Sequence, residues 1–412
     1  MWIALSLLAH LQPPLSPPAA PSQPAVIEPA ATPDKAPDLV SADLEVDLAI
    51  LVNKHSVPGL AAAVIVDGKV VRIGAAGKRA RGESAEATAN DLWHLGSCAK
   101  AMTATLAATF VERGELRWSM TLPELFPGEA VPPAWRDVTL ENLLTHRSGL
   151  PANVTDQPLW ASLFVSKNST RDDRQKVLRW ALTQQPACKP GEKFEYSNLG
   201  FMIAGHALET KADKAFEDLI QERLFTPLGI TSAGVGAPEG NHPRGHRGPG
   251  PKAPPVKADV WGDNPKSLGP AGAFHMTISD WARFVAFHSS GELPAQDAAP
   301  AAAAPLLTPD LVKKLHTPPE VPGAKPGDAA ATYALGWVTA TRPWAKAGPD
   351  SAGRALMHNG SNTMWYCVTW VAPECGLAVV VACNQAGPAA EKACDEAAAK
   401  FLTRESRQKG KK

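Results

Sequence analysis

Apolar residues recur at helical spacing in several stretches of the chain. The clearest stretch runs from Trp93 to Gly114, where Leu95, Met102, Leu106 and Phe110 follow one another at about the spacing of helical turns. Gly114 is a plausible end for this helix, because glycine readily adopts the left-handed conformation of a helix C-terminus. The same kind of pattern predicts further helices at residues 44–54, 139–144, 171–184, 199–210, 216–225, 277–287 and 388–402.

Apolar runs near the two ends of the chain predict strands. Residues 60–66 and 69–74 are joined by Asp67-Gly68, a strong hairpin signal. Residues 333–338, 365–372 and 377–383 predict three more strands, the last two joined by a turn at Pro373 to Gly376. Because strands lie at both ends and helices between them, we expect an α+β fold. One central antiparallel sheet would be flanked by terminal helices, with a mostly helical region inserted at about residues 91–330.

The start of the chain differs in composition from the rest. It reads MWIALSLLAHL and continues into a proline-rich run from Pro13 to Pro37. The apolar stretch is about as long as the core of a signal peptide and too short to span a bilayer, but no basic residue precedes Lys35. We therefore interpret residues 1–42 as a candidate signal peptide and linker. We expect a periplasmic or secreted protein, with a cytoplasmic location left open. One domain would cover residues 43–404, followed by a solvated basic tail at residues 405–412.

Proline and glycine mark three long irregular stretches. Residues 122–135 hold four prolines and are expected to form a loop. Residues 236–270 are rich in glycine and proline, and the stretch is long enough to shape a binding pocket. Residues 291–305 are an alanine- and proline-rich segment of low complexity, which we expect to be a disordered insertion.

Composition excludes several functional classes. The 412 residues include 41 Lys and Arg against 41 Asp and Glu, so no net field would attract nucleic acid or an anionic membrane. The six cysteines form no Cys-x-x-Cys pair, and we expect buried free thiols, although single disulfides stay open. His242 and His246 are four residues apart, but the prolines and glycines around them argue against a helical metal pair. No metal or cofactor is implied.

Candidate chemistry begins with Ser97 and Lys100, three residues apart at the start of the predicted helix. Positions i and i+3 share a helix face, so the hydroxyl and the amine should lie side by side. An amine can take the proton of a hydroxyl only if it is itself neutral part of the time, and burial pushes a lysine that way. This pair alone is common on helices. Two further motifs follow it, Tyr196-Ser197-Asn198 ahead of a predicted helix and His358-Asn359-Gly360 at the edge of a strand.

In this order, the three motifs resemble those of the serine beta-lactamase-like superfamily. The resemblance extends to LLTHRSGLP at residues 143–151, GPAGAFHMTISDWARF at 269–284 and YALGW at 333–337. It covers roughly residues 44–403 and points to the branch of class C beta-lactamases, D-alanyl-D-alanine carboxypeptidases and related esterases. The resemblance implies a serine hydrolase that forms an acyl-enzyme with a small-molecule or peptide substrate.

The resemblance also implies a role for each motif residue. Ser97 would be the nucleophile, and Lys100 and Tyr196 would share the proton transfers. Tyr196 can act as a base only if cations such as Lys100 stabilise its phenolate. Asn198 would donate to the substrate amide and help position Lys100. The oxyanion hole would consist of the backbone N–H groups of Ser97 and Ser361, and Gly360 would let the strand approach the substrate.

The third motif departs from the Lys-Thr-Gly of true beta-lactamases of this type. A fixed cation is replaced by His358, largely neutral near pH 7, and a hydroxyl is replaced by the Asn359 amide. Both changes weaken recognition of an anionic carboxylate. We therefore rank an ester or amide substrate above a beta-lactam, with a true beta-lactamase or a D-Ala-D-Ala carboxypeptidase as the alternative.

Alternatives without chemistry also stay open. An inactive relative could bind peptidoglycan fragments or a protein partner. Tyr196 and Asn198 could belong to a helix-capping turn, and His358 could be a strand-edge histidine whose hydrogen bonds are satisfied within the protein.

Overall fold

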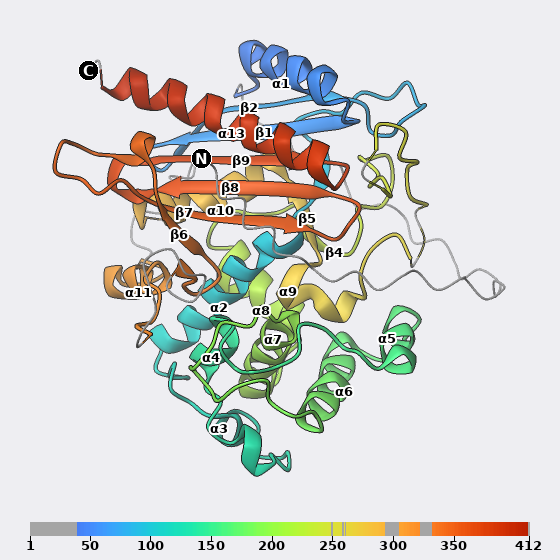
Figure 1. Ribbon diagram of the computed structural model, residues 1–412, viewed down its shortest axis with the longest axis vertical. Coiled ribbons are helices and arrows are strands. Elements are labelled where there is room, and N and C mark those ends of the chain that lie inside the picture. Colours follow the sequence, from blue (N-terminus) through green and yellow to red (C-terminus); the bar gives the residue numbers. More distant parts are fainter. Residues whose placement is uncertain are drawn as a thin grey trace. The chain divides into compact units, whose positions relative to one another are not determined.

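A six-stranded antiparallel sheet forms the centre of the computed structural model, which describes residues 39–248, 250–257, 259, 261–292, 305–321 and 332–410 (Figure 1). The strand order is β2-β1-β9-β8-β7-β6. The strands are β1 (Gly59–Val66), β2 (Lys69–Gly77), β6 (Val338–Thr341), β7 (Arg354–Ser361), β8 (Tyr366–Ala372) and β9 (Leu377–Cys383). Because β1 pairs with β9, the two ends of the chain unite in one sheet, as predicted.

The hairpin between β1 and β2 follows from its turn residues. Asp67 and Gly68 have φ angles of 50° and 70°, the left-handed pair that a two-residue hairpin turn requires. The whole of β1 except Val66 is buried, because both faces of the sheet are covered.

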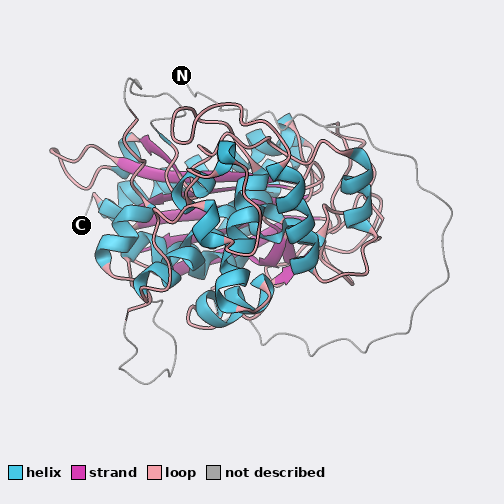
Figure 2. Ribbon diagram, turned by 90° about the horizontal axis from the view of Figure 1, so that it is seen from below, coloured by secondary structure: helices cyan, strands magenta, loops and turns pink. Residues whose placement is uncertain are grey.

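Terminal helices cover one face of the sheet, and a helix from the middle of the chain covers the other (Figures 1 and 2). Helices α1 (Ala42–His55) and α13 (Pro388–Lys409) share a core with one sheet face. On the opposite face α10 (Ile278–Ser290) joins the sheet to the larger core of the inserted region. Thr277 caps α10, because its side chain accepts a hydrogen bond from the Asp280 N–H.

The inserted region packs around one central helix, α2 (Ala99–Glu112), which is buried continuously from Ala99 to Phe110. The other helices of this region are α3 (Leu122–Leu125), α4 (Leu140–Leu144), α5 (Gln157–Phe164), α6 (Thr170–Leu182), α7 (Asn198–Ala212), α8 (Phe216–Ile220), α9 (Gly269–Gly272) and α11 (Pro309–Leu315). A small second sheet has the order β3-β5-β4, with strands β3 (Leu92–His94), β5 (Phe274–Thr277) and β4 (Gly234–Val235). Short helical turns complete the chain: η1 (Gly96–Cys98), η2 (Pro133–Trp135), η3 (Gln221–Phe225), η4 (Lys266–Leu268), η5 (Pro343–Ala345) and η6 (Pro373–Cys375).

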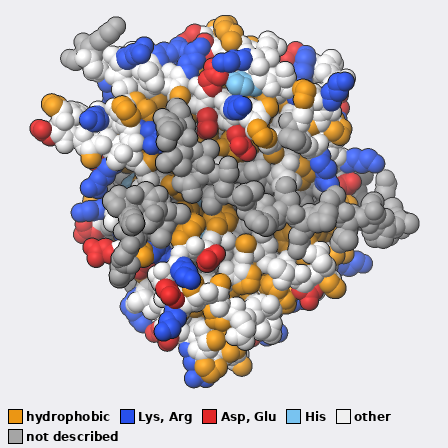
Figure 3. Space-filling view, in the orientation of Figure 1, with side chains coloured by type: hydrophobic (Ala, Val, Ile, Leu, Met, Phe, Trp, Pro, Cys, Tyr) orange, Lys and Arg blue, Asp and Glu red, His pale blue; other side chains and the backbone are white. Residues whose placement is uncertain are grey.

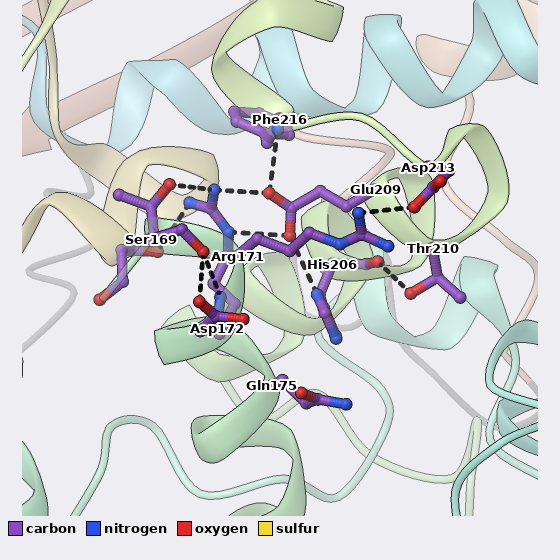
Figure 4. Close-up of polar contacts among 12 residues, drawn as sticks. Ser169, Arg171, Asp172, Gln175, His206, Glu209, Thr210, Asp213 and Phe216 are labelled. Atoms are coloured by element: carbon purple, nitrogen blue, oxygen red, sulfur yellow. Dashed lines mark hydrogen bonds and ion pairs between the residues drawn. The ribbon is translucent and has the colours of Figure 1, made fainter.

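A buried ion cluster holds α6, α7 and α8 together. The guanidinium of Arg174 is fully buried and pairs with Glu209 at 2.7 Å and with Glu217 at 3.0 Å. Glu209 also accepts hydrogen bonds from the His206 ring and from the Phe216 N–H, as Figure 4 shows. Arg174 donates at 3.3 Å to the Ser267 carbonyl, which ties this cluster to the turn just before α9.

Several local predictions were wrong. Leu95 lies outside the central helix, and Ser97 lies in η1. The reason is that the chain leaves β3 and makes one short helical turn, η1, before α2 begins. Residues 122–135 contain α3 and η2, since proline is compatible with the first turn of a helix. The last part of the helix predicted at 216–225 winds as the wider turn η3.

Two further differences concern the C-terminal part. Residues 333–337 are not a strand: Gly336 has a φ of 78°, and only Tyr333 makes an isolated bridge to Val338. Helix α13 runs to Lys409, so residues 405–409 are helical rather than a solvated tail, and the buried Glu405 pairs with Arg72. Most of the predicted insertion at 291–305 lies outside the described residues.

The described surface mixes charges of both signs. Figure 3 shows basic and acidic side chains interspersed on the face that it presents. Among the residues that the structure describes, no helix combines the length and the apolar character needed to cross a membrane.

Candidate active site

Ser97 sits where the small sheet, the large sheet and α2 meet. It lies in η1, directly after β3 and directly before α2. Gly96 has a φ of 47°, and a Cβ there would lie 2.4 Å from the Ser361 nitrogen, so a side chain has no room. A Cβ on Gly360 would lie 2.1 Å from the Leu95 oxygen and 2.8 Å from the Ser97 nitrogen. The end of β7 therefore lies directly against the turn that carries Ser97.

Lys100 is fully buried and makes three polar contacts. Its Nζ lies 3.0 Å from Ser97 Oγ, 2.7 Å from Asn198 Oδ1 and 2.6 Å from the Ala271 carbonyl oxygen. The last two partners can only accept, whereas the serine hydroxyl can also donate. A neutral amine satisfies all three, with two N–H groups on the carbonyl oxygens and its lone pair on the Ser97 O–H. Burial accordingly lowers the pKa of Lys100 well below that of an ordinary lysine.

Tyr196 reaches the same hydroxyl from another side. Its phenol donates to Ser97 Oγ at 2.9 Å, and Lys100 Nζ lies 4.9 Å from the centre of its ring. Burial raises the pKa of Tyr196 above the usual value, and this effect outweighs the hydrogen bond to Ser97, which lowers it. The condition for a tyrosinate base is therefore not favoured in the free protein, because burial shifts the pKa values of both Lys100 and Tyr196 toward their neutral forms.

The Tyr196-Ser197-Asn198 turn both caps helix α7 and contributes side chains to the site. Ser197 caps α7, because its hydroxyl accepts from the Gly200 N–H at 3.1 Å. Asn198 Oδ1 accepts from Lys100, and its Nδ2 donates to Asn153 Oδ1 at 2.8 Å. The capping alternative thus holds for Ser197 and not for Tyr196 or Asn198, whose side chains reach Ser97 and Lys100.

His358 is a buried histidine whose hydrogen bonds are satisfied within the protein. Its Nε2 lies 3.1 Å from the Tyr333 hydroxyl, and its Nδ1 lies 2.5 Å from the Asn359 carbonyl oxygen. Burial lowers the pKa of His358 to about 3. His358 is therefore neutral, as expected, but its two ring nitrogens are both engaged by protein atoms. Its position in the wall of the site matches the structural alternative.

The side chain of Asn359 does not reach Ser97, the candidate nucleophile. Side chains alternate along a strand, and β7 places His358 and Gly360 on the face that meets η1. The Asn359 amide donates to the Tyr366 hydroxyl at 3.3 Å, and Tyr366 belongs to the core beneath α1 and α13. The Asn359 side chain therefore points toward that core, and these contacts do not support its predicted role as a substrate-binding residue. Ser361, the last residue of β7, is exposed.

Two site residues escaped the sequence analysis, although both lie in motifs that carried the resemblance. The His146 ring lies between Tyr196 and Tyr333, with centroid distances of 4.2 Å and 4.5 Å. His146 Nδ1 accepts from the Ser197 N–H at 3.0 Å, which fixes the Tyr196 turn. Tyr333 holds His358. In the sequence, both residues are only members of the LLTHRSGLP and YALGW motifs, with no predicted role of their own.

The histidines and cysteines outside this site lie in surroundings that are typical of structural residues. His242 contacts Asp91, whereas His246 is held by the Arg81 N–H and the Asn384 carbonyl. Among the described residues, no group of three or more His, Cys, Asp or Glu side chains could hold a metal ion. All six cysteines are free, and four of them are buried: Cys98, Cys367, Cys383 and Cys394.

Fold and site define an α+β protein of the beta-lactamase and penicillin-binding-protein type. A beta-lactamase from Sulfitobacter sp. EE-36 superimposes with a TM-score of 0.65 at 22% identity, over 88% of this chain and 97% of the other. The Beta-lactamase family profile matches residues 38–403, and the chain belongs to that family.

Two curated relatives illustrate the kinds of protein whose sequences are similar to this chain. Penicillin-binding protein 4 of Amycolatopsis lactamdurans is 31% identical over 244 residues, which are 57% of this chain and 60% of the relative. The unguisins hydrolase ungD of Aspergillus violaceofuscus is 27% identical over 267 residues, 61% of this chain and 46% of the relative. The chain thus spans about half the length of the curated relatives that it matches.

Proposed function

We propose that this protein is a serine hydrolase that cleaves ester or amide substrates through an acyl-enzyme on Ser97. One observation carries the proposal: a buried Lys100 amine and the Tyr196 phenol both lie within hydrogen-bond distance of the same serine hydroxyl. The described contacts of Lys100 are two carbonyl oxygens and a hydroxyl, so they supply no carboxylate that would keep the amine charged.

Acylation would begin with proton transfer within this cluster. Ser97 Oγ attacks the substrate carbonyl carbon while its proton passes to the lone pair of Lys100 Nζ. The carbon–leaving-group bond then breaks, and the leaving oxygen or nitrogen takes a proton from the Tyr196 phenol. The Lys100 ammonium returns a proton to the phenol. In this scheme Tyr196 is a proton relay and Lys100 the base.

The tetrahedral oxygen would be bound by the backbone N–H groups of Ser97 and Ser361. Gly96 and Gly360 support this assignment, because their missing side chains let the two backbone segments touch. Removing one such donor typically costs about 10²–10³ in rate. Deacylation would use the same groups, with water taking the place of the leaving group.

Substrate preference is inferred from the side of the site that strand β7 forms. His358 is neutral and engaged with Tyr333, and Asn359 is bonded on the other side of the sheet. Neither offers the fixed cation or the hydroxyl that would hold the carboxylate of a beta-lactam. We therefore expect short-chain esters to be better substrates than nitrocefin. A beta-lactamase or D-Ala-D-Ala carboxypeptidase activity is the second candidate, which the relationship to penicillin-binding protein 4 favours.

The test combines covalent labelling with turnover. A fluorophosphonate probe should label the folded protein, and Ser97→Ala should abolish the labelling. Turnover of p-nitrophenyl esters, D-amino-acid amides, D-Ala-D-Ala peptides and nitrocefin should then be compared. Equal or faster nitrocefin hydrolysis would overturn the substrate preference. A folded wild-type protein that never labels would favour the inactive, peptidoglycan- or partner-binding alternative.

The apolar start of the chain supports export to the periplasm or the medium as a further part of the proposal. Fractionation of cells that express the full chain would test it. Recovery of an N-terminally shortened protein outside the cytoplasm is expected, and full-length protein confined to the cytoplasm would contradict it.

A further inference from the structure

We infer that Asp263, His94 and Asn362 form a positioning unit that holds the two oxyanion donors at a fixed separation. The inference rests on the proposed function and deepens it. None of the three residues belongs to the motifs that define the site. They come from the loop before α9, from β3, and from the segment directly after β7.

His94 controls the backbone on the Ser97 side. Its ring is fully buried, and its Nδ1 accepts a hydrogen bond from the Gly96 N–H at 3.1 Å. A backbone N–H can only donate, so Nδ1 must carry a lone pair and Nε2 must carry the proton. Nε2 lies 2.7 Å from Asp263 Oδ2. The carboxylate therefore fixes the tautomer of His94, and His94 in turn fixes the peptide that precedes Ser97.

Asp263 controls the backbone on the Ser361 side with its other oxygen. Asn362 Nδ2 donates to Asp263 Oδ1 at 2.6 Å, and Asn362 is the residue next to Ser361. Asn362 Oδ1 accepts from the N–H groups of Met364 and Trp365, at 3.2 Å and 3.0 Å, which leaves it no freedom to turn. One buried carboxylate thus joins both walls of the oxyanion hole, and Asp263 is only 7% exposed.

The loop that carries Asp263 is anchored separately. Trp261 stacks on Phe164 of α5 with a centroid distance of 4.8 Å, and Arg247 donates to the Trp261 carbonyl at 3.3 Å. The stretch at 236–270, expected from the sequence to shape a pocket, therefore also acts on the oxyanion hole through Asp263. The chemistry favours this role, because donors aimed at a developing charge must be held in place before reaction.

The test compares an ester with its thionoester, in which sulfur replaces the carbonyl oxygen. Sulfur is larger and accepts hydrogen bonds poorly, so an ordered oxyanion hole prefers the oxygen substrate. We expect Asp263→Asn to lower the ratio of the two kcat/KM values by at least about tenfold, since loss of a donor costs about 10²–10³. In this variant the new NH2 group would face a donor in either orientation, the Asn362 NH2 group or the His94 Nε2–H. The ratio does not depend on the fraction of folded enzyme. His94→Gln serves as the second variant and should change the ratio in the same direction.

A matched control is another Asp–His contact among the described residues, in which the carboxylate is buried and the imidazole is partly exposed. Asp91 is 1% exposed and lies 3.2 Å from His242, but its described partners do not include the oxyanion segments. Asp91→Asn should lower stability and leave the ratio unchanged. An unchanged ratio in both Asp263→Asn and His94→Gln, or an equal change in Asp91→Asn, would overturn the inference. A wild-type protein without ester hydrolysis would instead overturn the proposed function beneath it.

Discussion

Two of the completely buried basic side chains, Arg174 and Lys100, lie in opposite electrostatic surroundings. Arg174 lies between Glu209 and Glu217 in the helical region, and Figure 4 shows the further contacts of Glu209 with His206 and Phe216. Burial alone would lower its pKa, but the two carboxylates outweigh burial and raise it. Lys100 is equally buried, but its described partners are two carbonyl oxygens and a hydroxyl, and burial lowers its pKa far below the usual value.

This difference separates a buried charge that holds helices together from a buried amine that can take part in proton transfer. A buried cation with matched carboxylates is locked in its charged form and joins helices. A buried amine without a carboxylate is held near neutrality and can take a proton. The pKa of Glu209 shows the same locking: burial would raise it, but His206 and Arg174 hold it at about 2. Burial by itself therefore does not distinguish a proton-accepting lysine from a structural one, whereas burial without a counter-ion is what a proton-accepting lysine requires.

Replacing Lys100 should give the largest effect on activity. Lys100→Met keeps the length of the side chain and removes the base, so kcat/KM for esters should fall by about 10²–10⁴, near the upper end of that range. Chemical denaturation should show a much smaller loss of stability than the change at Arg174 described next. Ester turnover that survives within tenfold of wild type would mean that another group accepts the Ser97 proton.

The reverse outcome is expected at Arg174. Arg174→Met leaves Glu209 and Glu217 without their cation and should cost about 3–5 kcal/mol of unfolding free energy. Because the described partners of Arg174 are Glu209, Glu217, Thr170 and the Ser267 carbonyl, none of which is a residue of the site, kcat/KM per folded molecule should change little. Urea unfolding and active-site titration, performed on the same sample, measure the two quantities. A large loss of kcat/KM in fully folded protein would remove the distinction between the two buried cations.

A smaller effect is expected at Tyr196, and it should depend on the leaving group. Tyr196→Phe removes the proposed relay, which we expect to cost about 10² for an alkyl ester, the lower end for a proton-transfer group. A p-nitrophenyl ester needs little protonation of its leaving group and should lose less. Steady-state rates for the two esters give the comparison. Equal losses would indicate that the phenol acts only by holding Ser97.

The sequence predicted the sheet because its signals were local. The Asp67-Gly68 turn and the apolar runs at β8 and β9 specify strands without reference to the rest of the chain. Their union into one sheet followed from the fold class. Ser97, Lys100, Tyr196 and Asn198 were found because their motifs are short, and the structure brings these four together.

The features that the sequence did not predict depend on contacts between segments that are far apart in the chain. The YALGW segment looked like a strand, and its true constraint, the close approach of Gly336 to Lys100 and Ala101, is visible only in three dimensions. Tyr196 was expected to gain from a charged Lys100, but whether burial neutralises the lysine depends on what surrounds it. Asp263 illustrates the same limit, since its partners His94 and Asn362 lie 169 and 99 residues away.

The protonation of Lys100 can be measured directly by an NMR titration of protein labelled with ¹³C at the lysine ε carbon. The Lys100 resonance is identified by its absence in Lys100→Met, and the exposed lysines give an internal reference. We expect the Lys100 signal to titrate well below the usual lysine pKa of 10.5. A Lys100 signal that titrates together with the exposed lysines would contradict its assignment as the neutral base of Ser97.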